Sequence, residues 1–347
     1  MGKRKIFKIV FVILSIFLCV VFYESFGICI AYKKRPEVSN TIKKETQNDS
    51  WNERSENMVR AVIIEKNPEA LLQRVRLIKN AKKEIILSTF AFQSDESGKL
   101  ILGALHDAAD RGVHIRLLVD GMDSWIDMEG NPYFYGLSSH ENVEIKLYNK
   151  ANPLKPWKMM GRMHDKYLIA DGKRYILGGR NTYNYFLGDF PGHKNYDRDV
   201  LVVCDEPEKE NSVNQLSEYF ETIWNQEDSG YFHNNKKLAN RKSVKNAVLE
   251  LQNGYQKYFE ENKERICDTD YTDETFETEK IALVSNPIHT GSKEPVVWYQ
   301  LGELMKNAKN RVKIHTPYII CNDMMYNTWE EIAENVSDFS IMTNSVA

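Results

Sequence analysis

The chain has 347 residues, of which 42% are hydrophobic and 27% charged, and its formal net charge is −3. This length and apolar content allow a substantial buried core and exclude an intrinsically disordered protein. The five cysteines are scattered without the paired spacing of zinc ligands. The sequence therefore predicts neither a zinc site nor a disulfide framework, and we expect no metal or other cofactor.

An apolar segment near the N-terminus predicts one membrane-spanning helix. Four basic residues lie within the first eight positions, and the chain is then apolar from residue 9 to 23 and from 26 to 32. This is long enough to cross a bilayer core of ~30 Å. We expect residues 1–35 to be a membrane anchor whose basic residues slightly favour a cytoplasmic N-terminus. A cleaved signal peptide is the alternative, although no A-x-A site is evident before Lys33.

Residues 36–57 are polar and lack apolar periodicity, so they are expected to form a linker. Globular sequence begins near Met58. Apolar residues recur at helical spacing from Leu71 to Ile78, and a β-α-β unit is expected from Ile85 to Asp120. The sequence thus predicts a first α/β domain over residues 58–225.

The most informative segment runs from His164 to Asn181 and reads H-D-K-Y-L-I-A-D-G-K-R-Y-I-L-G-G-R-N. On an extended strand, side chains two positions apart share a face, so His164 and Lys166 should point the same way. A neutral imidazole can attack phosphorus, while Lys166 and the amide of Asn181 hold the oxygens on which charge builds. Asp171 and the following glycine predict a hairpin turn, and Gly179 predicts a close approach of the backbone to substrate or chain. The pattern indicates phosphoryl transfer without a metal.

The pattern H-x-K-x4-D followed by G-G-x-N resembles the signature of the phospholipase D superfamily, and its flanks resemble bacterial cardiolipin synthases. The resemblance implies a mixed β-sheet flanked by helices, a bacterial membrane enzyme and a phosphohistidine formed on His164. It also implies that Asp199, in the Asp-Arg-Asp sequence after the motif, orients an active-site imidazole. The alternative for Asp199 is an ion pair at a strand edge with Arg198 or Lys194. Asp171 belongs to the catalytic motif, although fixing the turn is the role that its position favours.

Ten basic and five acidic residues lie between Lys150 and Asp199. This positive neighbourhood in an acidic chain favours an anionic substrate, and a solvated face is the simpler alternative. The expected partners are the lipid bilayer and an anionic, phosphatidylglycerol-like phospholipid. An acyl-chain channel could be lined by side chains on both sides of the motif, for most of which ordinary packing is favoured: Trp157, Met159, Met160, Met163, Tyr183, Tyr185 and Phe186.

A polar, helical connection is expected over residues 226–290. The flanking patterns predict amphipathic helices over 214–224 and 244–266, and a solvated acidic loop over 268–279.

Residues 291–347 repeat the opening of the first domain. The sequence LIKNAK at 77–82 recurs as LMKNAK at 304–309, and a strand, a helix and a second strand are expected after each copy. The fold class is therefore α/β, with one complete half and the start of a second pseudo-repeat.

No second H-x-K-x4-D occurs in the sequence. The resemblance implies one active site built from two such motifs, in which one histidine attacks and the other protonates the leaving oxygen. We therefore expect a chain cut short before its second motif. A homodimer that brings two copies of His164 together is the alternative.

Three functions remain open. The leading one is a membrane-anchored phosphatidyltransferase similar to cardiolipin synthase. The second is a phosphodiesterase or endonuclease of the same superfamily, against which the sequence pI of about 6.3 argues, because non-specific nucleic-acid affinity comes mostly from Lys and Arg. The third is an inactive fragment, since loss of the general acid alone lowers rates by roughly 10²–10⁴.

Overall fold

The computed structural model describes residues 3–48, 59–204 and 211–344. Residues 49–57 of the expected linker, and the expected domain start at Met58, lie outside these ranges. The chain divides into two compact units, one formed by Met1–Ala31 with Arg54–Leu283 and the other by Tyr32–Glu53 with Val284–Ala347.

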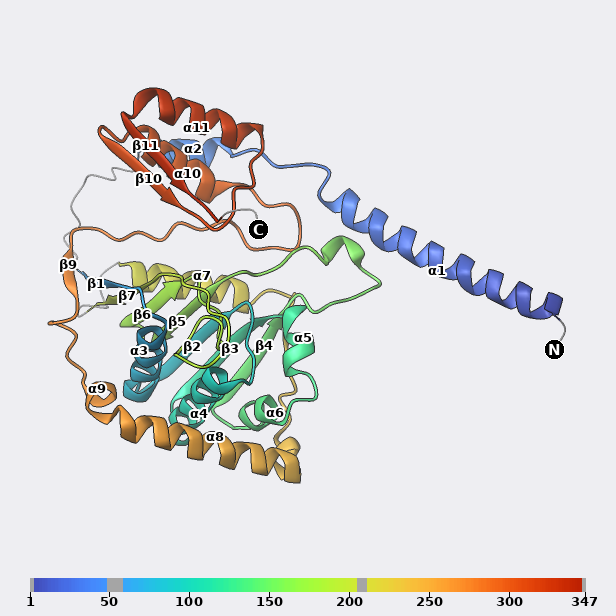
Figure 1. Ribbon diagram of the computed structural model, residues 1–347, viewed down its shortest axis with the longest axis horizontal. Coiled ribbons are helices and arrows are strands. Elements are labelled where there is room, and N and C mark those ends of the chain that lie inside the picture. Colours follow the sequence, from blue (N-terminus) through green and yellow to red (C-terminus); the bar gives the residue numbers. More distant parts are fainter. Residues whose placement is uncertain (1–2, 49–58, 205–210, 345–347) are drawn as a thin grey trace. The chain divides into compact units, whose positions relative to one another are not determined.

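The first unit is built on a nine-stranded mixed sheet with the strand order β8-β4-β3-β2-β5-β6-β7-β1-β9 (Figure 1). Strands β2, β3 and β4 are parallel to one another, whereas β5, β6 and β7 form an antiparallel meander beside β2. The strands are β1 (Val59–Ile64), β2 (Glu84–Thr89), β3 (His114–Asp120), β4 (Val143–Tyr148), β5 (Lys166–Ala170), β6 (Arg174–Gly178), β7 (Asp199–Val203), β8 (Ser229–Tyr231) and β9 (Phe276–Thr278).

Helices cover both faces of this sheet. Figure 1 shows α3, α4 and α6 on one face, with α8 packed outside α4 and α6, and α7 on the opposite face. The helices are α3 (Asn67–Asn80), α4 (Glu96–Asp110), α5 (Asp123–Met128), α6 (Pro132–Ser138), α7 (Ser212–Trp224), α8 (Lys242–Glu261) and α9 (Lys263–Cys267), with the 3-10 helices η1 (Pro156–Lys158) and η2 (Lys236–Asn240). The α/β class and the flanked mixed sheet are as predicted.

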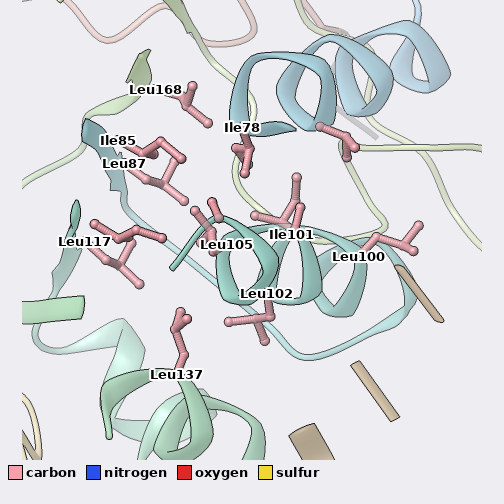
Figure 2. Packing of buried hydrophobic residues seen from close by; sticks show 14 of the residues in the cluster. Ile78, Ile85, Leu87, Leu100, Ile101, Leu102, Leu105, Leu117, Leu137 and Leu168 are labelled. Atoms are coloured by element: carbon pink, nitrogen blue, oxygen red, sulfur yellow. The ribbon is translucent and has the colours of Figure 1, made fainter. Parts of the chain in front are cut away.

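The core lies between the sheet and its first helical layer. In Figure 2, Ile85 and Leu87 of β2 and Leu168 of β5 meet Ile101 and Leu105 of α4. All five side chains are buried, and they come from the apolar positions that alternate along the strands and recur along the helix. Helix α4 begins where the Asp95 carboxylate accepts a hydrogen bond from the Gly98 amide at 3.0 Å.

The second unit reproduces the opening of the first, as the repeated sequence predicts. It contains α10 (Val296–Lys306), β10 (Arg311–His315), α11 (Asp323–Asn335) and β11 (Asp338–Met342). Strands β10 and β11 pair in parallel, as β2 and β3 do in the first unit.

Part of the polar segment expected to be a linker is helical. Helix α2 spans Asn40–Asn48 in the second unit. The Ser39 carbonyl accepts the first helical hydrogen bond, and Val38 and Thr46 are buried. Val38, Ile42 and Thr46 are spaced by four residues and form one narrow stripe along the helix. This periodicity is weak in an otherwise polar segment.

The N-terminal apolar segment forms a single helix, α1 (Lys3–Ala31). By length and composition, its part from Arg4 to Ala31 can cross a membrane. A signal sequence passes the same test.

Two expectations for the downstream segment need correction. The helix expected over 244–266 is broken into α8 and α9 at Asn262. The acidic segment 268–279 is not a solvated loop throughout: it holds the buried Arg76 guanidinium through the Asp268 and Glu274 carboxylates, and β9 extends the sheet. Nothing in the sequence around Arg76, which lies on α3, indicates that it pairs with these two distant carboxylates.

Candidate active site

His164 and Lys166 lie at the edge of the sheet where the parallel strands end. Lys166, the first residue of β5, pairs with Thr89, the last residue of β2. Ligands of α/β proteins bind outside this carboxyl edge of the parallel strands. Between the two residues, Asp165 accepts a hydrogen bond from the Tyr219 hydroxyl of α7 at 2.8 Å. Asp165 thus points to the face of the sheet covered by α7. By strand alternation, the side chains of His164 and Lys166 point to the opposite face, as predicted.

Phe90 forms one wall of the site. Its ring packs edge-on against the His164 imidazole with 4.7 Å between ring centroids. The Lys166 ammonium lies 5.4 Å from the centroid of the same phenyl ring. One aromatic side chain at the end of β2 therefore brings the candidate nucleophile and the candidate cation together.

The surroundings of His164 favour the neutral imidazole. Partial burial is the main cause that lowers its pKa, and the nearby Lys166 ammonium lowers it further. Among the described residues, none forms a hydrogen bond with either ring nitrogen. A neutral ring with an available lone pair is the form that attacks phosphorus.

Lys166 is the charged group of the site. Its side chain is buried, and its Nζ donates a hydrogen bond to the His164 carbonyl at 2.7 Å. Burial lowers the pKa of Lys166 to about 8, against the opposing effect of Asp165 and Asp197. The ammonium is therefore mostly protonated at pH 7 and can hold an anionic oxygen.

Asn181 follows β6 and is also buried. Its side-chain oxygen accepts a hydrogen bond from the Ala91 amide at 3.2 Å. The neighbouring Thr182 amide donates to the Ala91 carbonyl at 3.0 Å, so the segment after β6 is fixed beside the segment after β2. Because the oxygen is occupied, the NH₂ group of Asn181 is the part that can donate to a phosphate.

The two glycines after β6 are required by close approach of the chain to itself. Gly178 pairs with Asp199 across β6 and β7, and a Cβ atom at Gly178 would overlap the Asp199 carboxylate. A Cβ atom at Gly179 would overlap the carboxylate of Asp197. The close approach predicted for Gly179 is therefore made by this chain's own acidic segment, and a phosphate contact by its backbone stays a prediction.

Asp199 lies in a buried ion-pair network. Its Oδ2 is 2.9 Å from Nη1 of Arg74 on α3 and 3.2 Å from Nη1 of Arg180, and all three side chains are buried. The alternative, an ion pair of Asp199 with Arg198 or Lys194, is not formed among the described residues: Arg198 binds Glu65, and Lys194 donates to a backbone carbonyl. No described histidine forms a hydrogen bond with Asp199, and its role in orienting an imidazole stays a prediction.

Asp171 lies at the other end of β5. Its carboxylate accepts hydrogen bonds from the backbone amides of Lys82, Lys83 and Glu84, at distances between 2.7 and 3.2 Å. Asp171 and Gly172 both adopt left-handed conformations, with φ of 54° and 63°, as the hairpin turn requires. The five residues of β5 place Asp171 roughly 16 Å along the strand from Lys166. Direct participation in the chemistry is excluded by this distance, and the structural role in the turn agrees with the geometry.

Two residues beside the His164 segment were missed by sequence reasoning. Asp120, at the end of β3, is fully buried and its Oδ2 accepts a hydrogen bond from the Met163 amide at 3.0 Å, directly before His164. Phe90 is the second. Asp120 had one usable signal, since a carboxylate directly after a buried parallel strand points to the ligand edge. Nothing in the sequence signals the contact of Phe90 with His164.

The side chains considered for an acyl-chain channel divide into two groups. Met163 and Phe186 are buried, and Tyr183 and Tyr185 pack against the core, so these four are ordinary packing as favoured. In the second group, Trp157 and Met160 are exposed and Met159 is half-buried. For the residues that the structure describes, no group of three His, Cys, Asp or Glu side chains could hold a metal ion.

The family described as cardiolipin synthase, PLD-like domain, matches residues 75–224, which contain His164, Lys166, Asn181 and Asp199. This part of the chain is a phospholipase D-like domain. The phospholipase D-like chain is 30% identical to cardiolipin synthase C of Escherichia coli over 154 residues, which cover 40% of this chain and 31% of that protein.

A longer match joins it to an uncharacterized protein of Helicobacter pylori (strain ATCC 700392 / 26695), at 28% identity over 315 residues. That match covers 83% of this chain and 59% of the Helicobacter protein, so the chain spans less than two thirds of this relative. The fold of the phospholipase D-like chain is also that of phosphatidylserine synthase from Haemophilus influenzae Rd KW20, with a TM-score of 0.56. The sequence identity is 15%, and the match covers 88% of this chain and 66% of that one.

Proposed function

We propose that this chain provides the nucleophilic half of a phosphatidyltransferase site that works through a phosphohistidine at residue 164. A ring nitrogen of His164 attacks the phosphorus of a membrane phosphodiester, and the N–P bond forms as the bond to the leaving oxygen breaks. The electron pair leaves on that oxygen, which takes a proton from a second imidazole of the two-motif site. An acceptor alcohol then attacks the phosphohistidine, loses its proton to the second imidazole and frees the ring.

The observation that carries the proposal is the pair formed by His164 and Lys166 against Phe90. Burial lowers the pKa of both groups, but by amounts that leave a neutral imidazole beside a charged ammonium at neutral pH. A nucleophile needs the first state, and stabilisation of the negative charge that develops on phosphoryl oxygens needs the second. The amide of Asn181 adds a donor from the adjacent strand end.

Three features support a membrane phospholipid as the substrate. Cardiolipin synthase C is among the relatives, α1 is long and apolar enough to cross a bilayer, and basic residues outnumber acidic ones around the motif. Lipid with a phosphatidylglycerol-like headgroup is therefore preferred to nucleic acid.

The test is to trap the covalent intermediate. The full chain in vesicles that contain phosphatidylglycerol labelled in its phosphate should acquire label at His164 that is stable in base and lost in acid. His164→Ala should abolish labelling and turnover, and Lys166→Met should reduce turnover by at least 10²-fold, in the range of lost oxyanion donors. His193→Ala and Lys173→Met are the matched controls, because both residues are exposed and lie outside the site.

Two outcomes would contradict the proposal. One is cleavage of single-stranded DNA with no turnover of lipid, which would favour the endonuclease alternative. The other is lipid turnover that survives His164→Ala, which would move the nucleophile elsewhere.

A further inference from the structure

Exposed apolar side chains gather on two segments that flank the candidate site. On α5, Trp125 is 65% exposed and Ile126 78% exposed. On residues 149–163, the segment that leads into the motif, Leu154 is 77% exposed and Trp157 and Met160 are also exposed. We call these five side chains the apolar rim. Large apolar groups that remain in water mark a surface that another phase or molecule covers.

The two segments of the rim are joined at the site by Asp120. Its Oδ1 accepts a hydrogen bond from the Met122 amide, which leads into α5, at 3.0 Å. Its Oδ2 accepts one from the Met163 amide, which leads into His164, also at 3.0 Å. One buried carboxylate thus places both segments beside the nucleophile.

The charge of the second segment is uniformly positive. Residues 149–163 contain four basic residues and no acidic one. Lys155 is exposed next to Leu154 and Trp157. The acidic residues of α5, Asp123 and Asp127, lie on its half-buried side, and the Asp127 carboxylate accepts a hydrogen bond from Gln93.

The same segment lies beside the end of α1. The Tyr23 hydroxyl donates a hydrogen bond to the Leu154 carbonyl at 2.8 Å. Gly27 of α1 is so close to Pro156 that a Cβ atom would overlap the proline ring. The last turns of a helix able to cross a bilayer are therefore in contact with the segment that carries Leu154 and Trp157.

We propose that the apolar rim inserts into the surface of an anionic phospholipid bilayer and so delivers lipid headgroups to His164. Tryptophan beside lysine is the composition of protein segments at the membrane–water interface, where the rings enter the headgroup region and the cations meet anionic lipid. The contact with α1 favours a bilayer over a protein partner. The identity of the delivered headgroups rests on the proposed function, whereas insertion of the rim does not.

Insertion can be measured without turnover. The full chain is reconstituted into vesicles of phosphatidylcholine and phosphatidylglycerol, with and without brominated acyl chains that quench tryptophan fluorescence. Because α1 contains no tryptophan, the anchor itself adds no signal. Trp125→Tyr and Trp157→Tyr should each remove part of the quenched fluorescence, whereas Trp329→Tyr in the second unit should leave that part unchanged.

Turnover provides the second readout. Ile126→Asp should lower the turnover of bilayer phosphatidylglycerol at least tenfold and leave that of a monomeric, short-chain phosphodiester within twofold. Leu249→Asp on α8 is the matched control, because its side chain is 57% exposed and lies far along the chain from the rim.

The outcomes separate the two proposals. Quenching that is equal in wild type and both rim variants would overturn insertion, even if lipid turnover persists. Quenching at the rim without turnover of any phosphodiester would support insertion and refute the proposed function. An equal loss on bilayer and short-chain substrates in Ile126→Asp would overturn the delivery role.

Discussion

Replacing Asp199 with asparagine tests what the buried carboxylate does. In the structure, Asp199 lies between the guanidinium groups of Arg74 and Arg180, and burial lowers the pKa of Arg180 against the opposing effect of Asp199. The substitution keeps the shape of the side chain and removes its charge. Two buried cations then face each other without their shared counter-ion.

The expected cost follows from the burial of all three groups. Breaking a buried ion pair by removing one partner costs ~3–5 kcal/mol, and the remaining amide oxygen places this case near ~3 kcal/mol. With a urea dependence of ~2–3 kcal/mol per M, the unfolding midpoint should fall by roughly 1–1.5 M. Arg198→Gln is the control: its ion pair with Glu65 is exposed on both sides, so the free energy of unfolding should change by less than ~1 kcal/mol.

Pulse proteolysis of the full chain in detergent and urea measures the midpoint. Arg74→Met added to Asp199→Asn should cost less than the sum of the single changes, because it removes one of the two unpaired cations. A midpoint within ~0.3 M of wild type for Asp199→Asn, i.e. below ~1 kcal/mol, would refute the reasoning. The pH profile of turnover distinguishes the other role, since an imidazole that loses an orienting carboxylate shifts its acidic limb to lower pH.

Three further predictions concern the motif itself. Turnover should fall as pH rises through about 8, where Lys166 loses its proton, and Lys166→Arg should remove this alkaline limb. Turnover should also fall at acidic pH, below the lowered pKa of His164, where the imidazole becomes protonated. Asp171→Ala should lower the free energy of unfolding by ~1–3 kcal/mol, measured in urea, with the rate per folded molecule unchanged. Gly178→Ala should lower the free energy of unfolding by more than ~1 kcal/mol, because the added Cβ overlaps the neighbouring strand. Gly254→Ala is the control: its position is surrounded by open space, so the free energy of unfolding should stay the same or rise. Equal urea midpoints for the two variants would contradict the overlap at Gly178.

Local periodicity was sufficient for the elements that determine the fold. The Asp-Gly pair at 171–172 predicted the hairpin of β5 and β6, and the repeated LIKNAK sequence predicted that β10 and β11 follow the pattern of β2 and β3. Such features depend on neighbours within a few residues. The helix over Asn40–Asn48 was missed because a single stripe of three residues gives little signal.

The parts of the site that sequence reasoning missed depend on contacts between distant segments. Arg74 and Asp199 are 125 residues apart, and an arginine on a helix resembles an ordinary surface cation until its partner is known. The same holds for Phe90 and Asp120, which meet the segment around His164 only once β2, β3 and β5 are aligned at one edge. The candidate reacting groups could be proposed from the sequence alone, whereas the residues that support them were found only in the three-dimensional arrangement.

The number of residues between the lysine and the aspartate of the motif is set by the length of β5. Lys166 is the first residue of β5, at the ligand edge, and Asp171 directly follows the last residue of β5. At that end, the backbone amides of residues 82–84, which lead into β2, donate hydrogen bonds to the Asp171 carboxylate. The four residues between the lysine and the aspartate therefore span the sheet along this strand, from the ligand edge to the opposite edge. Deleting one of them would force the chain to release either the anchored turn or the imidazole, and it would also reverse which side chains face α7.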